Sequence, residues 1–322
     1  MSKKDTLSRR DFLGKSGLAL GAVATLPALP AAAAAAAKLP HRVLGRTGVS
    51  VPILAFGCGS RFLMYEPEEA GLAALNRAID MGITYLDTAI DYGDGKSETR
   101  VGKVMSTRRK EVFLATKIPG RARTRDAALK EVEASLQRLQ TDHVDLLHIH
   151  SLGDEADLAK IEAPDGVLKA LYELRGQKVA RFIGMTSHTD GAVMAKAIEK
   201  NDLDCVQMAM NPARAARFEE LALPAARAKN LGVILMKVTG QEHLLGPGKA
   251  EAAPLLRYAW SLPVTTVVCG MPKPEFVAAN VASARGFAPM PAGEMDRLRE
   301  QLAGQRVVLE QFFARHHDCR MA

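Results

Sequence analysis

The feature that most constrains the fold is a regular alternation, after residue 40, of short apolar runs with longer amphipathic stretches. Runs that are apolar throughout suit strands buried on both faces of a parallel sheet, which helices then cover. Eight such units in about 250 residues favour a closed (β/α)8 TIM barrel over an open sheet. The expected strands are residues 53–56, 83–86, 112–116, 144–149, 182–185, 205–210, 233–236 and 266–269.

Two further pieces extend this barrel. Residues 42–52 place two glycines between short apolar pieces, which predicts a small β-hairpin before the first strand. Residues 291–313 follow the last barrel helix and predict one extra C-terminal helix outside the barrel. A Rossmann fold would need G-x-G-x-x-G after the first strand, and residues 57–59, Gly-Cys-Gly, lack the third glycine. The expected barrel helices include residues 68–81, 125–140, 167–177, 191–199, 218–229 and 254–260.

The first 37 residues have the order of an export signal. A basic start containing S-R-R-D-F-L-G-K at residues 8–15 is followed by an apolar run and then by prolines and seven alanines. The apolar run is about half of the ~20 residues that a membrane span needs. The S-R-R-x-F-L pattern resembles the twin-arginine (Tat) export signal. The alternative is a basic N-terminus with a chance arginine pair.

This pattern predicts a Tat signal peptide over residues 1–37, bound by the Tat machinery through residues 8–15, and an enzyme domain over residues 38–322. After cleavage the protein would be periplasmic, with no stable membrane anchor. Net charge is +7, and residues 1–37 supply +3 of it from five basic and two acidic residues. The remaining +4 forms no cluster interleaved with aromatic residues, so nucleic-acid binding is not expected.

Polar side chains come at the ends of three successive expected strands. The four residues concerned are Asp87, Lys117 and His150 at strand ends, and Tyr92 on the loop after the first of them. Catalytic groups of TIM barrels lie at this rim. A lysine there needs a counter-charge, which Asp87 supplies, and its own charge favours the phenolate form of Tyr92.

A phenol tuned in this way can donate a proton to a carbonyl oxygen, while His150 hydrogen-bonds the same oxygen. The sequence offers no evident covalent nucleophile, and protonation of a carbonyl oxygen is useful when a hydride arrives at carbon. A nicotinamide cofactor is therefore implied. Each of the four residues alone also has an ordinary explanation, such as helix capping, packing or a surface lysine.

His148 and His150 form an H-x-H pattern that metal-dependent barrel hydrolases also use. Such a site needs further ligands, usually more histidines and a carboxylate. His188 ends another expected strand, but the eighth strand ends in Cys269 and Gly270 without an aspartate. The four cysteines lie far apart, so zinc or iron–sulfur sites are not expected. A Cys58–Cys269 disulfide is conceivable on neighbouring strands, but we expect no pairing because the loops there should hold cofactor.

Several segments, in the same order, resemble the aldo/keto reductase family over residues 42–280. The most specific is residues 87–98, D-T-A-I-D-Y-G-D-G-K-S-E, which closely matches the family's D-T-A-x-x-Y-G-x-G-x-S-E. The other matching segments are residues 42–48 (R-V-L-G-R-T-G), 114–117 (L-A-T-K), 145–150 (D-L-L-H-I-H) and 176–184 (G-Q-K-V-A-R-F-I-G). The resemblance implies a catalytic tetrad of Asp87, Tyr92, Lys117 and His150, with Tyr92 as general acid, that reduces an aldehyde or ketone to an alcohol.

The resemblance also implies cofactor contacts. Thr186, Ser187 and Gln207 correspond to carboxamide ligands, and Met236 takes the place of a tyrosine that stacks on the nicotinamide. Lys273 is the remaining cation near an adenosine 2′-phosphate, where the start of a helix also favours phosphate. The full set is Gly57, Asp87, Thr186, Ser187, Gln207, Met236, Gly240, Gly270, Lys273 and Asn280.

NADP(H) is thereby favoured over NAD(H), with a modest preference. Phe276 stands where Arg or Gln is usual in the family, and Ala279 stands where Glu is usual. Some members of the family hold the cofactor as binding or regulatory subunits and turn over little, which is the alternative function. Turnover with simple aldehydes separates the two. The sequence does not specify the substrate or the oligomeric state.

Overall fold

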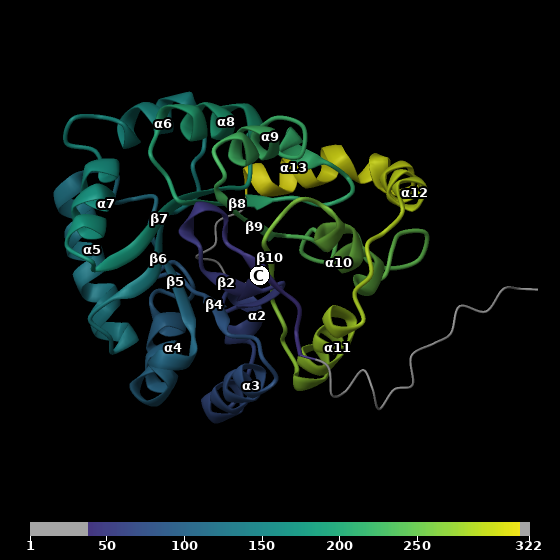
Figure 1. The fold of residues 1–322 in the computed structure, drawn as a ribbon, viewed down its shortest axis with the longest axis horizontal. Helices are drawn as coiled ribbons and strands as arrows, with labels where there is room; N and C mark the ends of the chain where they lie inside the picture. Colours follow the sequence, from purple (N-terminus) through teal and green to yellow (C-terminus); the bar gives the residue numbers. More distant parts are fainter. Residues whose placement is uncertain (1–37, 316–322) are drawn as a thin grey trace, which may run out of the picture.

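The computed structural model describes residues 38–315 and shows a closed barrel of eight parallel strands surrounded by helices (Figure 1). The strand order around the barrel is β10-β3-β4-β5-β6-β7-β8-β9. This confirms the predicted (β/α)8 TIM barrel, whereas the expected signal peptide lies outside the described residues. The strands are β3 (Leu54–Gly57), β4 (Tyr85–Asp87), β5 (Phe113–Ile118), β6 (Val144–Ile149), β7 (Ala180–Ser187), β8 (Cys205–Ala209), β9 (Gly232–Met236) and β10 (Thr266–Cys269).

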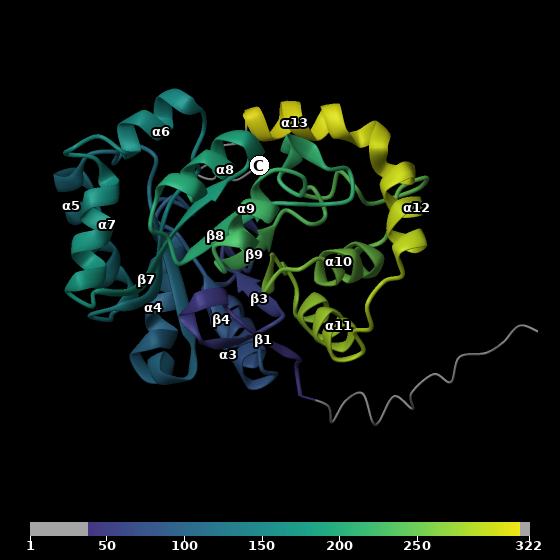
Figure 2. The same cartoon turned by 45° about the horizontal axis from the view of Figure 1, so that its top comes forward.

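Helices cover the outer face of the barrel on all sides (Figures 1 and 2). Their buried residues recur at helical spacing; in the helix over Arg125–Leu139, for example, Ala128, Val132, Ser135 and Leu139 face the barrel. Among the described residues, no helix is long and apolar enough to span a membrane. The helices are α2 (Ser60–Leu63), α3 (Glu68–Asp80), α4 (Lys96–Arg108), α5 (Arg125–Leu139), α6 (Glu155–Ile161), α7 (Val167–Gly176), α8 (Gly191–Lys200), α9 (Ala222–Ala228), α10 (Ala252–Ser261), α11 (Pro274–Arg285), α12 (Ala292–Leu302) and α13 (Arg306–Ala314).

The interior of the barrel is packed, and a hairpin closes one end. The predicted hairpin is present as β1 (His41–Val43) and β2 (Ser50–Pro52), paired antiparallel. Leu44 and Val51 of this hairpin join a buried cluster that takes side chains from every barrel strand. Catalytic chemistry is therefore confined to the opposite, carboxyl end of the strands. The strand residues of the cluster are Ala55, Tyr85, Phe113, Ala115, Leu146, Phe182, Cys205, Ile234 and Val268.

The predicted C-terminal helical segment is present outside the barrel, but it is not a single helix. Residues 291–313 were expected to form a single helix, but α12 and α13 are separated by a 3-10 turn at Ala303–Gln305. The turn lets both segments bury apolar side chains, Leu302 before it and Leu309 and Phe313 after it. A straight helix would leave the barrel surface, and Figure 2 shows the two segments following an arc around it.

Candidate active site

Three strands and one loop bring the four predicted catalytic side chains together at the carboxyl end of the barrel. Asp87 ends β4, Lys117 is the next-to-last residue of β5 and His150 follows β6. The ammonium of Lys117 donates to Asp87 Oδ2 at 2.8 Å, to the carbonyl of Thr88 at 2.9 Å and to Tyr92 Oη at 3.1 Å. Asp87 and Lys117 are buried, and Tyr92 is half-buried.

This arrangement fixes the electrostatics of the phenol. A buried ammonium requires a compensating charge, and the contact with Asp87 provides it. The Lys117 nitrogen also lies 4.8 Å from the centre of the Tyr92 ring. A cation at hydrogen-bond distance from a phenol oxygen stabilises the phenolate that remains after the phenol has given up its proton. The site can therefore deliver a proton from Tyr92 and take it back.

His150 is held by a residue that the sequence reading missed. Its Nδ1 lies 2.9 Å from Oδ2 of Asp91, and the other oxygen of this carboxylate accepts from Arg121 at 2.9 Å. The ring of His150 meets that of Tyr92 edge-on, with 5.9 Å between their centres. The available signal was the carboxylate placed directly before Tyr92, in a variable position of the motif.

His148 does not join this cluster through a hydrogen bond. It is fully buried, and neither ring nitrogen has a hydrogen-bond partner among the described residues. Burial, followed by the charges of Lys117 and His150, holds the pKa of His148 well below its usual range. Its ring occupies the space left by Gly184, where a Cβ would lie 2.6 Å from Nδ1. The described residues contain no group of three His, Cys, Asp or Glu side chains that could hold a metal.

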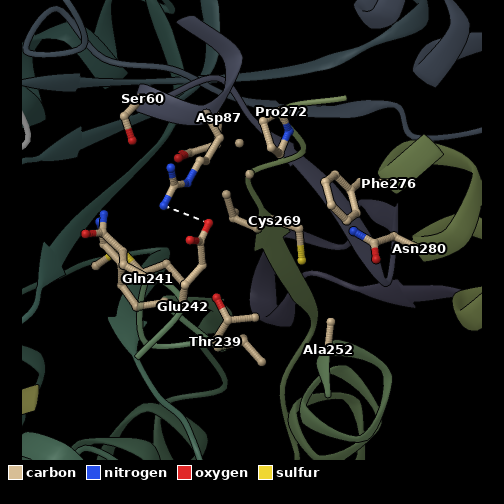
Figure 3. A pocket seen from close by; sticks show the side chains of 18 of the residues that line it. Ser60, Asp87, Thr239, Gln241, Glu242, Ala252, Cys269, Pro272, Phe276 and Asn280 are labelled. Carbon is tan, nitrogen blue, oxygen red and sulfur yellow. Dashed lines mark ion pairs between the residues drawn. The ribbon is translucent and has the colours of Figure 1, made fainter. Parts of the chain in front are cut away.

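A cavity runs from the tetrad between β9, β10 and α11 (Figure 3). Its empty space, including the part open to solvent, is about 1120 Å³. Gln207 lies at the tetrad end, where its Nε2 donates to Asp87 Oδ2 at 3.3 Å and lies 3.7 Å from the sulfur of Met236. Phe276 lies at the other end beside Asn280. The predicted cofactor residues that line the cavity are Gly57, Asp87, Gln207, Met236, Gly270 and Asn280.

Two of the predicted carboxamide ligands make hydrogen bonds within the protein. The hydroxyl of Thr186 accepts from the backbone N–H of Ser151 at 2.8 Å, and the hydroxyl of Ser187 donates to the carbonyl of Leu152 at 2.8 Å. Both side chains are fully buried and do not line the cavity. They anchor the loop that follows His150.

Two other predicted cofactor residues also lie away from the cavity lining. Gly240 is buried with φ +58°, and a Cβ there would lie 2.8 Å from Leu309 of α13. Packing against the C-terminal helix therefore explains this glycine. Lys273 is exposed at the N-terminus of α11, directly before Pro274.

An ion pair that no sequence pattern indicated joins two residues that line the cavity (Figure 3). Arg61 of α2 contacts Glu242 of the loop after β9 at 2.8 Å. Gly270 makes room for it, since a Cβ there would lie 2.8 Å from Cγ of Arg61. The nearby Cys58 and Cys269 are free thiols. Burial raises the pKa of Cys269 to about 12 and the pKa of Cys58 well above its usual value.

Comparisons with known proteins place this geometry in a family. The chain is 31% identical over 229 residues to the aldo-keto reductase yakc of Schizosaccharomyces pombe, whose name specifies NADP(+). That alignment covers 66% of this chain and 65% of the relative. It is 32% identical over 159 residues to L-galactose dehydrogenase of Arabidopsis thaliana, covering 46% of this chain and 49% of the relative. The chain thus spans about two thirds or less of the length of these curated relatives.

The fold also matches solved structures. An aldo-keto reductase from Klebsiella pneumoniae, solved in complex with NADPH, superimposes with a TM-score of 0.69. The match covers 83% of this chain and 95% of that structure at 23% identity, which shows a shared fold. Residues 55–255, more than half of this chain, match the aldo/keto reductase family. The match covers the barrel strands β4 to β9 and the D-T-A-x-x-Y motif at the rim of the barrel. The chain therefore belongs to the aldo/keto reductase family.

Proposed function

We propose that this protein reduces an aldehyde or ketone to the alcohol and oxidises NADPH to NADP⁺. The observation that carries the proposal is the Lys117 ammonium, which bonds both Asp87 and the hydroxyl of Tyr92 at the inner end of the cavity. Family membership supports the same reaction class. The reaction consumes one carbonyl compound, one NADPH and one proton, and it releases one alcohol and one NADP⁺.

The residues lining the cavity fit a nicotinamide cofactor. Oε1 of Gln207 is buried and has no hydrogen-bond partner among the described residues, so it can accept an N–H of a carboxamide. Gly57 lines the cavity without a side chain, and a Cβ there would lie 3.0 Å from Val268 and 3.1 Å from the carbonyl of Cys269 on the neighbouring strand. Met236 supplies a polarizable surface for a ring. When bound, the reduced nicotinamide supplies a hydride to the carbonyl carbon.

The side chains of the tetrad perform the rest of the chemistry. Tyr92 gives its proton to the carbonyl oxygen, and Lys117 stabilises the phenolate left behind. Asp87 compensates the lysine charge, so the ammonium stays in place without solvent. His150 bonds the same oxygen and fixes the orientation of the substrate. Water then returns a proton to Tyr92 after the alcohol leaves.

A modest preference for NADPH over NADH forms part of the proposal. The relatives support NADP(H), since one is named for NADP(+) and one was solved with NADPH. The adenosine end of the cavity is lined by Phe276 and Asn280, while Lys273 lies at the helix start outside the lining. Phe276, with 49% of its surface exposed, offers a face for adenine rather than a charge for the phosphate.

A spectrophotometric screen tests the function. Purified full-length chain is mixed with NADPH or NADH and a panel of simple aldehydes, ketones and sugars, and oxidation of the cofactor is followed. We expect turnover of at least one aldehyde, with a lower KM for NADPH than for NADH. Tight binding of NADPH without turnover of any carbonyl would instead support a regulatory protein that holds the cofactor. Equal KM values for the two cofactors would contradict the NADPH preference.

We further propose that the chain is exported by the Tat route and acts in the periplasm. The support is the S-R-R-x-F-L pattern of residues 8–13 and the order of basic, apolar and alanine-rich segments in residues 1–37, all outside the described residues. The Tat route carries folded proteins, so cofactor bound before export would stabilise the fold by mass action and travel with it.

A further inference from the structure

We propose that Asp91 is a positioning residue that holds His150 as an imidazolium, so that a substrate carbonyl receives a charged hydrogen bond from Nε2. The inference rests on the proposed carbonyl reduction and adds a fifth residue to its machinery. Asp91 stands at a variable position of the motif that identifies the tetrad, between Ile90 and Tyr92 in the loop after β4.

Asp91 and His150 form a buried, doubly anchored pair. The Asp91 side chain is 11% exposed and that of His150 is 2% exposed. Nδ1 of the imidazole lies 2.9 Å from Oδ2 of the carboxylate, and Oδ1 of the same carboxylate accepts from Arg121 at 2.9 Å. The backbone N–H of His150 donates to the carbonyl of Ile118 at 2.9 Å, which fixes the start of the side chain. Ring and carboxylate therefore have one relative orientation.

This contact determines whether each ring nitrogen of His150 carries a proton. An ionised carboxylate only accepts hydrogen bonds, so Nδ1 must carry a proton. A neutral imidazole has a single N–H, and with Nδ1 protonated its Nε2 is an acceptor. A carbonyl oxygen is also an acceptor only. For His150 to bond the substrate oxygen, both nitrogens must therefore carry protons, and Asp91 supplies the negative charge that the imidazolium needs.

In the described part of the chain, the ion pairs near His150 support Asp91 in this role. Lys117 is paired with Asp87, and His148 is neutral because burial lowers its pKa. Within residues 38–315, the Asp91 carboxylate is in contact with the ring at 2.9 Å. Other titratable and charged side chains that the described structure places around the Asp91–His150 pair are Tyr92, Arg121, Arg123 and His148, with Lys117 at hydrogen-bond distance from Tyr92.

The two nearby arginines, Arg121 and Arg123, do not separate Asp91 from His150. Arg123 donates to the backbone carbonyl of His150 at 3.0 Å and is paired with Asp157 at 2.8 Å. Arg121, whose side chain is 51% exposed, forms ion pairs with both Asp91 and Glu131, at 2.9 Å and 3.1 Å. Arg121 thus orients the carboxylate from the solvent side and leaves its other oxygen for the imidazole.

The consequence is a pH profile that depends on Asp91. A carboxylate in contact favours the charged imidazole, so its removal makes His150 lose the second proton at lower pH. With Asp91→Asn, the alkaline limb of kcat/KM for carbonyl reduction should move to lower pH. At pH 7, kcat/KM should fall about ten- to hundredfold, the range for a lost charged hydrogen bond. Affinity for NADPH should stay within about twofold, because Asp91 does not line the cavity.

The test compares the native chain, Asp91→Asn and the matched control Asp94→Asn, which makes the same change at an exposed aspartate two residues past Tyr92. Rates across the pH range are combined with nitrogen NMR of histidine-labelled full-length chain, in which His150→Gln assigns the signal. We expect a doubly protonated His150 at pH 7 in the native chain and in Asp94→Asn, and a singly protonated ring in Asp91→Asn. A pH profile of Asp91→Asn that superimposes on the native one would overturn the proposal.

The NMR measurement needs no substrate, so the two proposals fail separately. If the native chain reduces no carbonyl but His150 is an imidazolium at pH 7, the proposed function fails and the pairing holds. If the native chain reduces carbonyls but His150 is neutral at pH 7, the role of Asp91 fails and the function holds. The native spectrum decides the protonation state even if Asp91→Asn does not fold.

Discussion

At the scale of single residues, the site depends on charges that are buried only because each has a partner. Lys117 is 1% exposed and Asp87 is 2% exposed, and each would be costly to bury alone. Their pairing places a cation 3.1 Å from the Tyr92 hydroxyl. The general-acid role proposed for Tyr92 therefore depends on Lys117 and Asp87 as well as on the phenol.

Replacing Tyr92 tests this assignment. Tyr92→Phe should lower kcat for the best substrate by a factor of order 10² or more, because the general acid is lost. NADPH affinity, measured from the fluorescence of bound cofactor, should be retained. Tyr172→Phe is the control, since the hydroxyl of Tyr172 bonds the backbone of Asp202 far from the tetrad. Near-native turnover in Tyr92→Phe would show that another group donates the proton.

The Cys58 thiol provides a pH-dependent prediction. Its side chain is fully buried, and burial followed by the charge of Asp87 raises its pKa, so it remains a protonated thiol at neutral pH. Alkylation requires the thiolate. Because the folded pKa is raised, the free energy of unfolding should fall as pH rises above about 8.5, where the unfolded thiol ionises.

Iodoacetamide labelling followed by mass spectrometry checks this expectation. At pH 8 the folded chain should label at Cys58 far more slowly than the chain in concentrated urea. The folded rate should rise steeply only at strongly alkaline pH. Equal labelling rates for folded and unfolded chain at pH 8 would mean that the thiol is accessible and ionises normally.

At the scale of elements, the hairpin that closes the barrel depends on one glycine. Gly45 has φ +50°, and a Cβ there would lie 2.3 Å from the backbone nitrogen of Gly232 at the start of β9. Both the left-handed backbone and the close approach therefore exclude a side chain. The hairpin can seat Leu44 in the barrel interior only because this contact is possible.

Gly45→Ala should be markedly destabilising, and Gly48→Ala is its matched control. Gly48 also has a positive φ, +71°, but a Cβ there meets nothing within 4 Å. In Gly48→Ala the free energy of unfolding should fall by about 1 kcal/mol, the cost of backbone strain alone. In Gly45→Ala it should fall by about 3 kcal/mol or more, because the overlap with β9 adds to the strain. Urea unfolding followed by circular dichroism measures both. Equal losses would show that backbone overlap at β9 is relieved without cost.

At the scale of the whole molecule, the barrel is held by packing between elements that are distant in sequence. β10 pairs with β3, which closes the ring, and the C-terminal helices α12 and α13 pass over the outside (Figure 2). Phe313 of α13 packs near His188 after β7, with 6.3 Å between ring centres. The extension is thus part of the wall near the carboxyl end of the barrel.

The proposed export route is also a prediction about the whole chain. Arg9→Lys/Arg10→Lys should leave the protein uncleaved, folded and cytoplasmic, because the Tat receptor reads the arginine pair. The wild type should be found in the periplasm with a mature N-terminus near Lys38. Cell fractionation with N-terminal sequencing measures both. Normal export of the double variant would refute the Tat route. Full-length wild type in the cytosol would refute the periplasmic location.

How far the sequence predicted the molecule differs between its parts. The strand pattern was right to within a few residues at each end, because runs of apolar residues report burial directly. The bend at Ala303–Gln305 was missed, since an amphipathic period continues through a short turn. Among the predicted cofactor residues, Gly240 and Ser187 have packing or hydrogen-bond partners that only the structure reveals.

The sequence by itself determined the fold class and the four side chains at the rim. It could do so because period and motif are local properties, and a parallel barrel brings the ends of all strands to one face. Only the tertiary structure decided that Asp91 meets His150, that Arg61 crosses to Glu242 and that Leu309 covers Gly240. These contacts join loops and helices up to about 180 residues apart, and a sequence pattern shows which face is buried but not which distant side chain lies against it.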